Sequence, residues 1–301
     1  MTHDHTANSG RGRLAIAFGI TAAVLVAEVI GSIITGSLAL LADATHMLTD
    51  AGGLAIALVA ATLALKPPSS RRTFGFARAE VLGATAQAAI LLAVGIFVLV
   101  EAVRRLFEPP EIVGPQLLVF GVIGLLGNVA SIAVLASSRK NNLNVRAAFL
   151  EVTADALGSI AVIAAAIVIS LTGFQFADAI AAIFIGVLIV PRAVILLRDA
   201  ASVLLESTPK GLDLDDVRDH LLELDHVRSV HDLHVTQIAT GLPILTAHVV
   251  VDDECFHDGH APELLTQLQE CVAEHFAVAV EHSTFQLERA SHGETEHPTH
   301  D

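Results

Sequence analysis

Six apolar stretches, separated by short segments, constrain this chain more than any other feature. They cover about residues 14–34, 38–65, 79–103, 116–136, 147–171 and 177–197. Crossing a bilayer takes about 20 mostly apolar residues in a helix, and a helix satisfies its own backbone hydrogen bonds in lipid. With 53% of its residues hydrophobic, the chain is too apolar for an ordinary soluble domain. We therefore expect an α-helical membrane protein with a six-transmembrane-helix bundle over residues 13–205.

The pattern changes at about Pro209. A helical period over residues 212–224 is followed by alternating stretches over 227–238 and 244–252, a second helical stretch from Pro262, and a last alternating stretch over 281–288. This order predicts a small cytoplasmic α/β domain of the ferredoxin-like type, helix–strand–strand–helix–strand, over residues 206–289. The two ends, residues 1–12 and 290–301, are expected to be disordered tails.

Charge is distributed unevenly along the chain. Before Glu206 there are 13 basic and 12 acidic residues, whereas from Glu206 onward there are 4 basic and 20 acidic ones. The tail domain therefore carries nearly all of the net charge of −15. Binding to nucleic acid depends on basic patches, so the acidic tail argues against a nucleic-acid partner.

Basic residues also predict the orientation of the six spans. The N-terminal segment holds two Lys or Arg, the connection over residues 66–78 holds four, and the connection over 137–146 holds three. The first and fifth connections hold none, and the third has only Arg104 and Arg105. Because Lys and Arg accumulate in cytoplasmic loops, we expect both termini in the cytoplasm.

Two of the apolar spans carry paired metal-ligand residues. His46 and Asp50 lie four residues apart in the second span, and Glu151 and Asp155 lie four apart in the fifth. On a helix such pairs share one face, with Cβ atoms roughly 6 Å apart. Ionisable groups at membrane depth are expensive and usually face a bundle interior or an aqueous path. One imidazole and three carboxylates can complete a four-coordinate divalent-metal site; the alternative is polar side chains that only join helices.

Several motifs occur in an order that carries a family resemblance. They are GSLALLADATHMLTDAGG (Gly36–Gly53), FGFARAEVLGA, LGNVASIAVL, ADALGS, and in the tail VHDLHV, TAHVVV and HSTFQLE. Through these motifs the chain resembles, over about residues 12–288, the cation diffusion facilitator family of divalent-metal/proton antiporters, in particular its bacterial zinc exporters. The resemblance implies a multi-pass protein of the cell inner membrane that works as a homodimer among lipids. It also implies a protein that is not an enzyme and exports Zn²⁺ in exchange for protons.

The resemblance implies a transport site formed by His46, Asp50, Glu151 and Asp155. Zinc-transporting members usually have His at the position of Glu151, so this chain departs from their pattern. Oxygen ligands favour harder ions such as Mn²⁺, although carboxylates also bind zinc. The same fold and mechanism with selectivity for Mn²⁺, Co²⁺, Cd²⁺ or Fe²⁺ is therefore the alternative. Asp43 is either an entry-path ligand or a cavity-facing carboxylate, and Asn128 is expected to bond between helices.

The tail histidines resemble the regulatory metal positions of the family. They are His231, His248, His282 and, as a fourth, His260, which the resemblance implies bind Zn²⁺; the alternative is ordinary surface histidines. Weaker candidates are Asp232, His234, Cys255 and His257. The histidines near both ends of the chain (His3, His5, His292, His297 and His300) either gather metal loosely or belong to disordered tails.

Two other classes of function stay open at this point. A membrane-anchored metal sensor would need no ligands inside the membrane, and the two paired sets argue against it. A membrane metallohydrolase would use similar metal ligands, but the sequence shows no nucleophile motif and no phosphate-binding loop.

Overall fold

The computed structural model describes residues 4–64, 66–136 and 143–292. For residues 4–15, 50, 53–55, 57, 58, 60, 61, 64 and 143–148 it describes the main chain only. The chain divides into two compact units, Met1–Ala57 with Ala86–Leu197 and Leu58–Thr85 with Arg198–Asp301. Each unit is considered by itself below.

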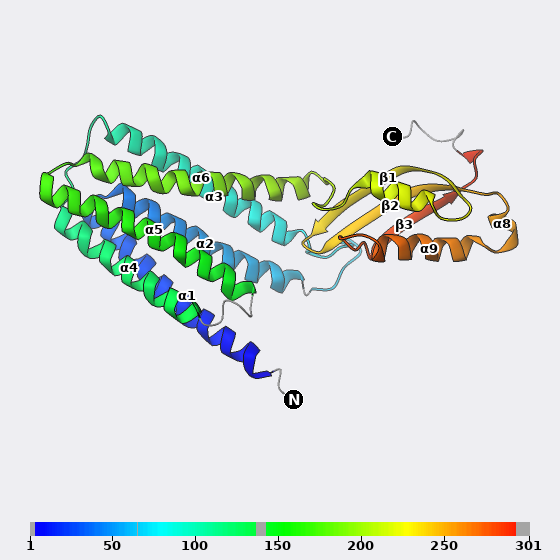
Figure 1. The fold of residues 1–301 in the computed structure, drawn as a ribbon, viewed down its shortest axis with the longest axis horizontal. Helices are drawn as coiled ribbons and strands as arrows, with labels where there is room; N and C mark the ends of the chain where they lie inside the picture. Colours follow the sequence, from blue (N-terminus) through cyan, green and yellow to red (C-terminus); the bar gives the residue numbers. More distant parts are fainter. Residues whose placement is uncertain (1–3, 65, 137–142, 293–301) are drawn as a thin grey trace. The chain divides into compact units, whose positions relative to one another are not determined.

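Six long helices occupy the first two thirds of the chain (Figure 1). They are α1 (Asp4–Thr35), α2 (Leu38–Ala64), α3 (Ala79–Arg105), α4 (Gly114–Ala136), α5 (Leu143–Thr172) and α6 (Phe176–Leu204). Five of them contain described stretches of 20–29 residues that are apolar enough to cross a membrane. In α2 the described apolar stretch is Leu38–Thr49. The prediction of a helical membrane bundle is confirmed, and the many apolar side chains exposed on these helices suit a lipid surround.

The core of the first unit is built from the inward faces of α2 to α6. Leu38, Val98, Leu117, Val162 and Ile185 are among its buried members, one from each helix. Helix α4 packs against both α1 and α5. Small residues let helices approach closely where lipid supplies no hydrophobic drive. α1, α4 and α5 are thereby close enough for polar side chains from the three helices to meet.

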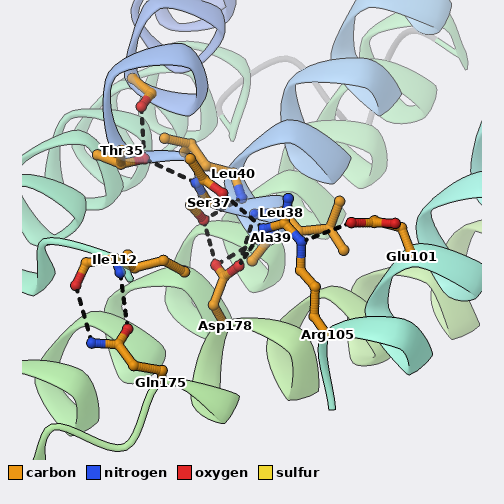
Figure 2. Close-up of polar contacts among 12 residues, drawn as sticks. Thr35, Ser37, Leu38, Ala39, Leu40, Glu101, Arg105, Ile112, Gln175 and Asp178 are labelled. Atoms are coloured by element: carbon orange, nitrogen blue, oxygen red, sulfur yellow. Dashed lines mark hydrogen bonds and ion pairs between the residues drawn. The ribbon is translucent and has the colours of Figure 1, made fainter. Parts of the chain in front are cut away.

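The first turn of α2 is held by a carboxylate from α6, as Figure 2 shows. Asp178 accepts hydrogen bonds from the Ser37 hydroxyl, from the Leu38 N–H at 2.7 Å and from the Ala39 N–H at 3.3 Å. The Arg105 guanidinium lies 3.7 Å from Asp178. A helix N-terminus has unpaired N–H groups and favours negative charge. Asp178 therefore caps α2 and fixes where this helix begins.

The second unit contains a three-stranded sheet with helices (Figure 1). Its elements are α7 (Leu214–Leu222), β1 (Val227–Ala239), β2 (Leu242–Val251), α8 (Cys255–Asp258), α9 (Ala261–Glu274) and β3 (His282–Glu288). The strand order is β1-β2-β3, with β1 antiparallel and β3 parallel to β2. The predicted α-β-β-α-β domain is confirmed, with the single turn α8 added before α9.

The two faces of this sheet differ. Along β2, residues at alternate positions from Leu245 to Val251 are buried, and they share a core with Leu221 of α7 and Leu268 of α9. The positions between them, including His248, are mostly half-buried. Because successive side chains of a strand point to opposite faces, His248 lies on the face that α7 and α9 do not cover.

The main chain near the N-terminus is helical from Asp4. Helix α1 begins at Asp4, whereas the sequence predicted a disordered segment over residues 1–12. The residues that disfavour a helix there are Gly10 and Gly12, and each destabilises a helix by only about 1 kcal/mol. A helix that nucleates in the apolar span can therefore extend through them towards the N-terminus. At the other end, the chain turns over residues 290–292, and residues 293–301 lie outside the described part.

Candidate metal site

Three of the four ligand residues predicted on α2 and α5 face each other. His46 Nε2 lies 3.8 Å from Asp155 Oδ1 and 3.9 Å from Glu151 Oε1. His46 is 7% exposed and Asp155 is 3% exposed, whereas the Glu151 side chain is 28% exposed. One imidazole nitrogen and two carboxylates thus converge from two helices, and nitrogen and oxygen donors of this kind bind Zn²⁺ and similar divalent ions.

Asp50, the fourth predicted ligand, belongs to α2, but its side chain lies outside the described residues. Its position, one turn after His46, places it on the same face of the helix. Thr49 donates its hydroxyl to the His46 carbonyl at 2.7 Å, and Gln87 of α3 donates to the Thr49 carbonyl at 3.1 Å. The second of these hydrogen bonds ties the ligand-bearing turn of α2 to α3.

Arg192 of α6 adds a cation that the sequence reasoning missed. Its two terminal nitrogens bind the two Glu151 oxygens at 2.5 and 2.7 Å. Such a two-point pair is the strong form of an arginine–carboxylate contact. The sequence does carry a signal for this contact, since Arg192 is a single arginine inside an apolar span, next to Pro191. An ionisable residue at membrane depth usually has a function or a charged partner.

A second polar group lies one helical turn along both ligand helices. Asp43 precedes His46 by three residues on α2, and Ser159 follows Asp155 by four on α5. Ser159 donates to Asp43 at 3.4 Å and accepts from the Asn128 amide of α4 at 3.2 Å. The prediction that Asn128 bonds between helices agrees with this contact. Asp43 is 2% exposed, so it is a carboxylate enclosed by protein.

The sheet of the second unit brings two of the four predicted tail ligands together. His231 and His248 are direct partners in the β1–β2 register, with ring centroids 5.2 Å apart. Glu288 joins them, with Oε1 2.7 Å from His248 Nδ1 and Oε2 3.4 Å from His231 Nε2. One ligand atom from each residue lies within 4.8 Å of the others. Two imidazoles and one carboxylate fit a zinc ion.

Glu288 is a member of this group that the sequence reasoning did not single out. It is 3% exposed although it ends a strand on the face without helices. A buried carboxylate is costly unless it is paired or binds metal. Asp232, a weaker sequence candidate, sits at a register shift of β1 with a φ of +46°. Bulges of this kind redirect side chains beside functional sites.

The other two predicted tail ligands lie elsewhere among the described residues. His282 starts β3 opposite Ile244, and its ring packs edge-on against Phe74 at 6.0 Å. His260 Nδ1 lies 2.8 Å from Asp258, and its ring is 5.6 Å from that of His226. The backbone N–H and the ring of His260 bind Asp258 and lower the pKa of this carboxyl. Within one chain, His260 and His282 are therefore not part of the His231–His248–Glu288 group.

Two family descriptions match the chain, one for each part. Residues 14–205 match the cation efflux transmembrane domain, and residues 209–290 match the cytoplasmic domain of cation efflux proteins. Together they cover most of the sequence.

Similar full-length proteins carry transport names. The metal cation efflux system protein CzcD of Cupriavidus metallidurans is 42% identical over 96% of this chain and 90% of its own length. The zinc transporter ZitB of Pectobacterium atrosepticum is 40% identical over 95% of this chain and 88% of its own. A cadmium, cobalt and zinc/H(+)-K(+) antiporter of Bacillus velezensis is 36% identical over 96% and 92%. The chain is a multi-pass metal cation efflux transporter and belongs to the cation diffusion facilitator family.

Proposed function

We propose that this transporter exports Zn²⁺ from the cytoplasm across the inner membrane in exchange for protons. The observation that carries the proposal is the convergence of His46, Glu151 and Asp155 between α2 and α5. Asp50 completes the set by its helical position. These groups offer one nitrogen and three carboxylates to a cation, with no need for a reaction at a covalent bond, so we propose a transporter and not an enzyme.

The nature of the ligands supports proton exchange. A metal ion needs His46 neutral and the carboxylates ionised, so metal binding and proton binding compete for the same atoms. Three carboxylates close together in a poorly solvated place repel one another, which favours keeping a proton when no cation is bound. The name of the Bacillus velezensis relative, which mentions H(+), agrees with this exchange.

Zinc is the substrate we favour among the divalent ions. An imidazole is a preferred zinc ligand, and the names of the Pectobacterium and Bacillus relatives mention zinc. Glu151 supplies oxygen where related zinc transporters usually have a histidine nitrogen, and Arg192 removes part of its negative charge. Mn²⁺, Co²⁺, Cd²⁺ and Fe²⁺ are therefore competing substrates that a flux assay must include.

We propose further that both termini are cytoplasmic and that the protein is a homodimer whose cytoplasmic domains bind regulatory Zn²⁺. His231, His248 and Glu288 would hold this zinc on the sheet face that the described helices leave uncovered. The ion would join β1, β2 and β3 at one point. In a dimer, His260 and His282 could take part only through a neighbouring chain, since they lie apart from the group within one chain.

Metal flux into proteoliposomes tests the proposal. The parent protein should take up Zn²⁺ faster when the vesicle lumen is more acidic than the outside, because protons then flow out as Zn²⁺ enters. Asp155→Ala and Asp50→Ala should abolish uptake while insertion in the membrane is retained. Asp199→Ala is the matched control and should transport normally, because this carboxylate of α6 pairs with the exposed Lys210 instead of facing the ligand group. Uptake without dependence on the proton gradient would refute the exchange, and normal uptake in Asp155→Ala would refute the site. A membrane-anchored sensor would bind Zn²⁺ without any flux.

A further inference from the structure

Glu28 of α1 is a buried carboxyl that the metal site does not use. It is 1% exposed, and neither of its oxygens accepts a hydrogen bond among the described residues. Asn128 Oδ1 and Ser131 Oγ of α4 are also buried without a hydrogen-bond partner in the described part of the chain. Native proteins rarely leave buried polar groups unpaired, and each exception calls for an explanation.

These unpaired atoms meet where α1, α4 and α5 come together. A methyl group added at Gly124 of α4 would lie 2.5 Å from Glu28 Oε1 and 3.0 Å from Ser159 Oγ of α5. The glycine thus leaves room for Glu28 beside the Ser159 hydroxyl. Ser159 in turn donates to Asp43 and accepts from Asn128. Glu28 therefore borders the polar group that lies one turn from the metal ligands.

Within the described part of the chain, two carboxylates oppose a negative charge on Glu28. Asp43 of α2 and Asp155 of α5 are the charged groups that act on it, and α4 carries no ionisable side chain. A buried carboxylate without a partner is strongly disfavoured, and two neighbouring carboxylates add repulsion. A neutral Glu28, with a proton on one oxygen, avoids both costs.

We propose that Glu28 is a second proton-binding site of this transporter, which loses its proton to bulk water when a divalent ion binds between α2 and α5. The O–H bond of the Glu28 carboxyl breaks, the proton leaves, and the carboxylate stays behind. The physical cause is charge: a bound divalent ion cancels the repulsion from Asp155 and attracts the Glu28 carboxylate, which offsets part of the cost of its burial. Charge and not contact transmits the effect, since Glu28 does not join the metal ligands. The inference rests on the proposed metal/proton exchange.

Proton release on Zn²⁺ binding tests the inference with the purified full-length protein. Calorimetry in buffers of different ionisation enthalpy gives the number of protons released for each Zn²⁺ bound. Each displaced proton also makes the dissociation constant change about tenfold per pH unit. Glu28→Gln should release about one proton fewer than the parent, with a correspondingly flatter pH dependence of Zn²⁺ affinity. Glu28→Asp, which keeps a carboxyl, should restore most of the release.

The matched control is Glu108→Gln, which removes an exposed carboxyl between α3 and α4 and should leave proton release unchanged. Unchanged release in a folded Glu28→Gln protein overturns the inference. If neither Glu28 variant folds, infrared difference spectra of the parent and of Gly124→Ala decide, because the added methyl group would meet Glu28 Oε1: a protonated-carboxyl band that is lost on adding Zn²⁺ and changes frequency in Gly124→Ala supports the inference, and the absence of such a band overturns it.

Two further arms separate this inference from its alternatives. Repeating the binding in K⁺ and in choline buffers shows whether Glu28 holds a monovalent metal ion instead; a K⁺ requirement that vanishes in Glu28→Gln overturns the proton assignment. If the parent itself releases no protons and its flux ignores the proton gradient, the proposed exchange fails. If the parent releases protons and its flux depends on the proton gradient, the exchange stands. If Glu28→Gln then releases as many protons as the parent, only the inference about Glu28 fails.

Discussion

The Glu151 carboxylate is bound at both oxygens by the Arg192 guanidinium, at 2.5 and 2.7 Å. This pair joins α5 to α6 at the edge of the metal-ligand group. It also places a positive charge next to a residue that is expected to bind a cation. We therefore expect Arg192 to compete with a metal ion for Glu151.

Replacing Arg192 with Met should strengthen metal binding. The Arg192 side chain is 41% exposed, so solvent weakens the pair, and we expect a gain of about 1 kcal/mol, or roughly fivefold in the Zn²⁺ dissociation constant. Calorimetry on the purified protein measures the Zn²⁺ dissociation constant of the parent and of Arg192→Met. Arg198→Met removes an exposed arginine farther along α6 and serves as the control. Weaker Zn²⁺ binding in Arg192→Met would mean that the arginine orients Glu151 instead of competing for it.

Substitutions of Glu151 should change metal preference and pH dependence in different ways. Glu151→His supplies a nitrogen and should shift transport towards Zn²⁺ over Mn²⁺ while activity is kept. Glu151→Gln keeps an oxygen but cannot ionise, so metal binding should weaken and part of the pH dependence should disappear. Uptake of both ions into proteoliposomes at several pH values distinguishes the variants. Identical preference and pH profile in the parent and both variants would remove Glu151 from the site.

The group on the sheet should bind metal without lying on the transport path. Changing His231, His248 and Glu288 together to Ala, Ala and Gln should abolish one Zn²⁺ equivalent in calorimetry on the full chain, and flux should fall only in part. His282→Ala is the informative comparison, because this ring packs against Phe74 in the described structure. Equal losses from the triple variant and from His282→Ala would show that all four residues act on one ion, shared between two chains.

Asp178 is expected to matter through the position of α2. Asp178→Ala would leave the Leu38 and Ala39 N–H groups and the Ser37 hydroxyl without their acceptor. Losing a cap and burying unpaired donors costs about 1–3 kcal/mol. Thermal unfolding in detergent should detect this loss, and Asp178→Asn, which keeps one acceptor, should lose less. Asp199→Asn, on the same helix, should unfold like the parent; a fall in its stability equal to that of Asp178→Ala would contradict the capping role.

The sequence predicted the helices well because each apolar span has one way to satisfy its backbone in lipid. Spacing by four predicted that each pair shares one face of its helix, and the family resemblance implied that the two pairs meet, as His46 does with Glu151 and Asp155. The sequence could not predict that Arg192 would bind Glu151, since that contact depends on how α6 is rotated against α5. Glu288 was missed for a similar reason: a strand pattern shows which residues share a face, but the register decides that Glu288 meets His231 and His248.

Asp155 and Ser159 lie on consecutive turns of one helix, the first facing His46 and the second hydrogen-bonded to Asp43. A rigid helix cannot turn at one of these positions and stay still at the other. Any tilt or rotation of α5 that opens the ligand group also changes the contact between Ser159 and Asp43. One movement of α5 would therefore change the binding of the divalent ion and the surroundings of the buried carboxyls at the same time.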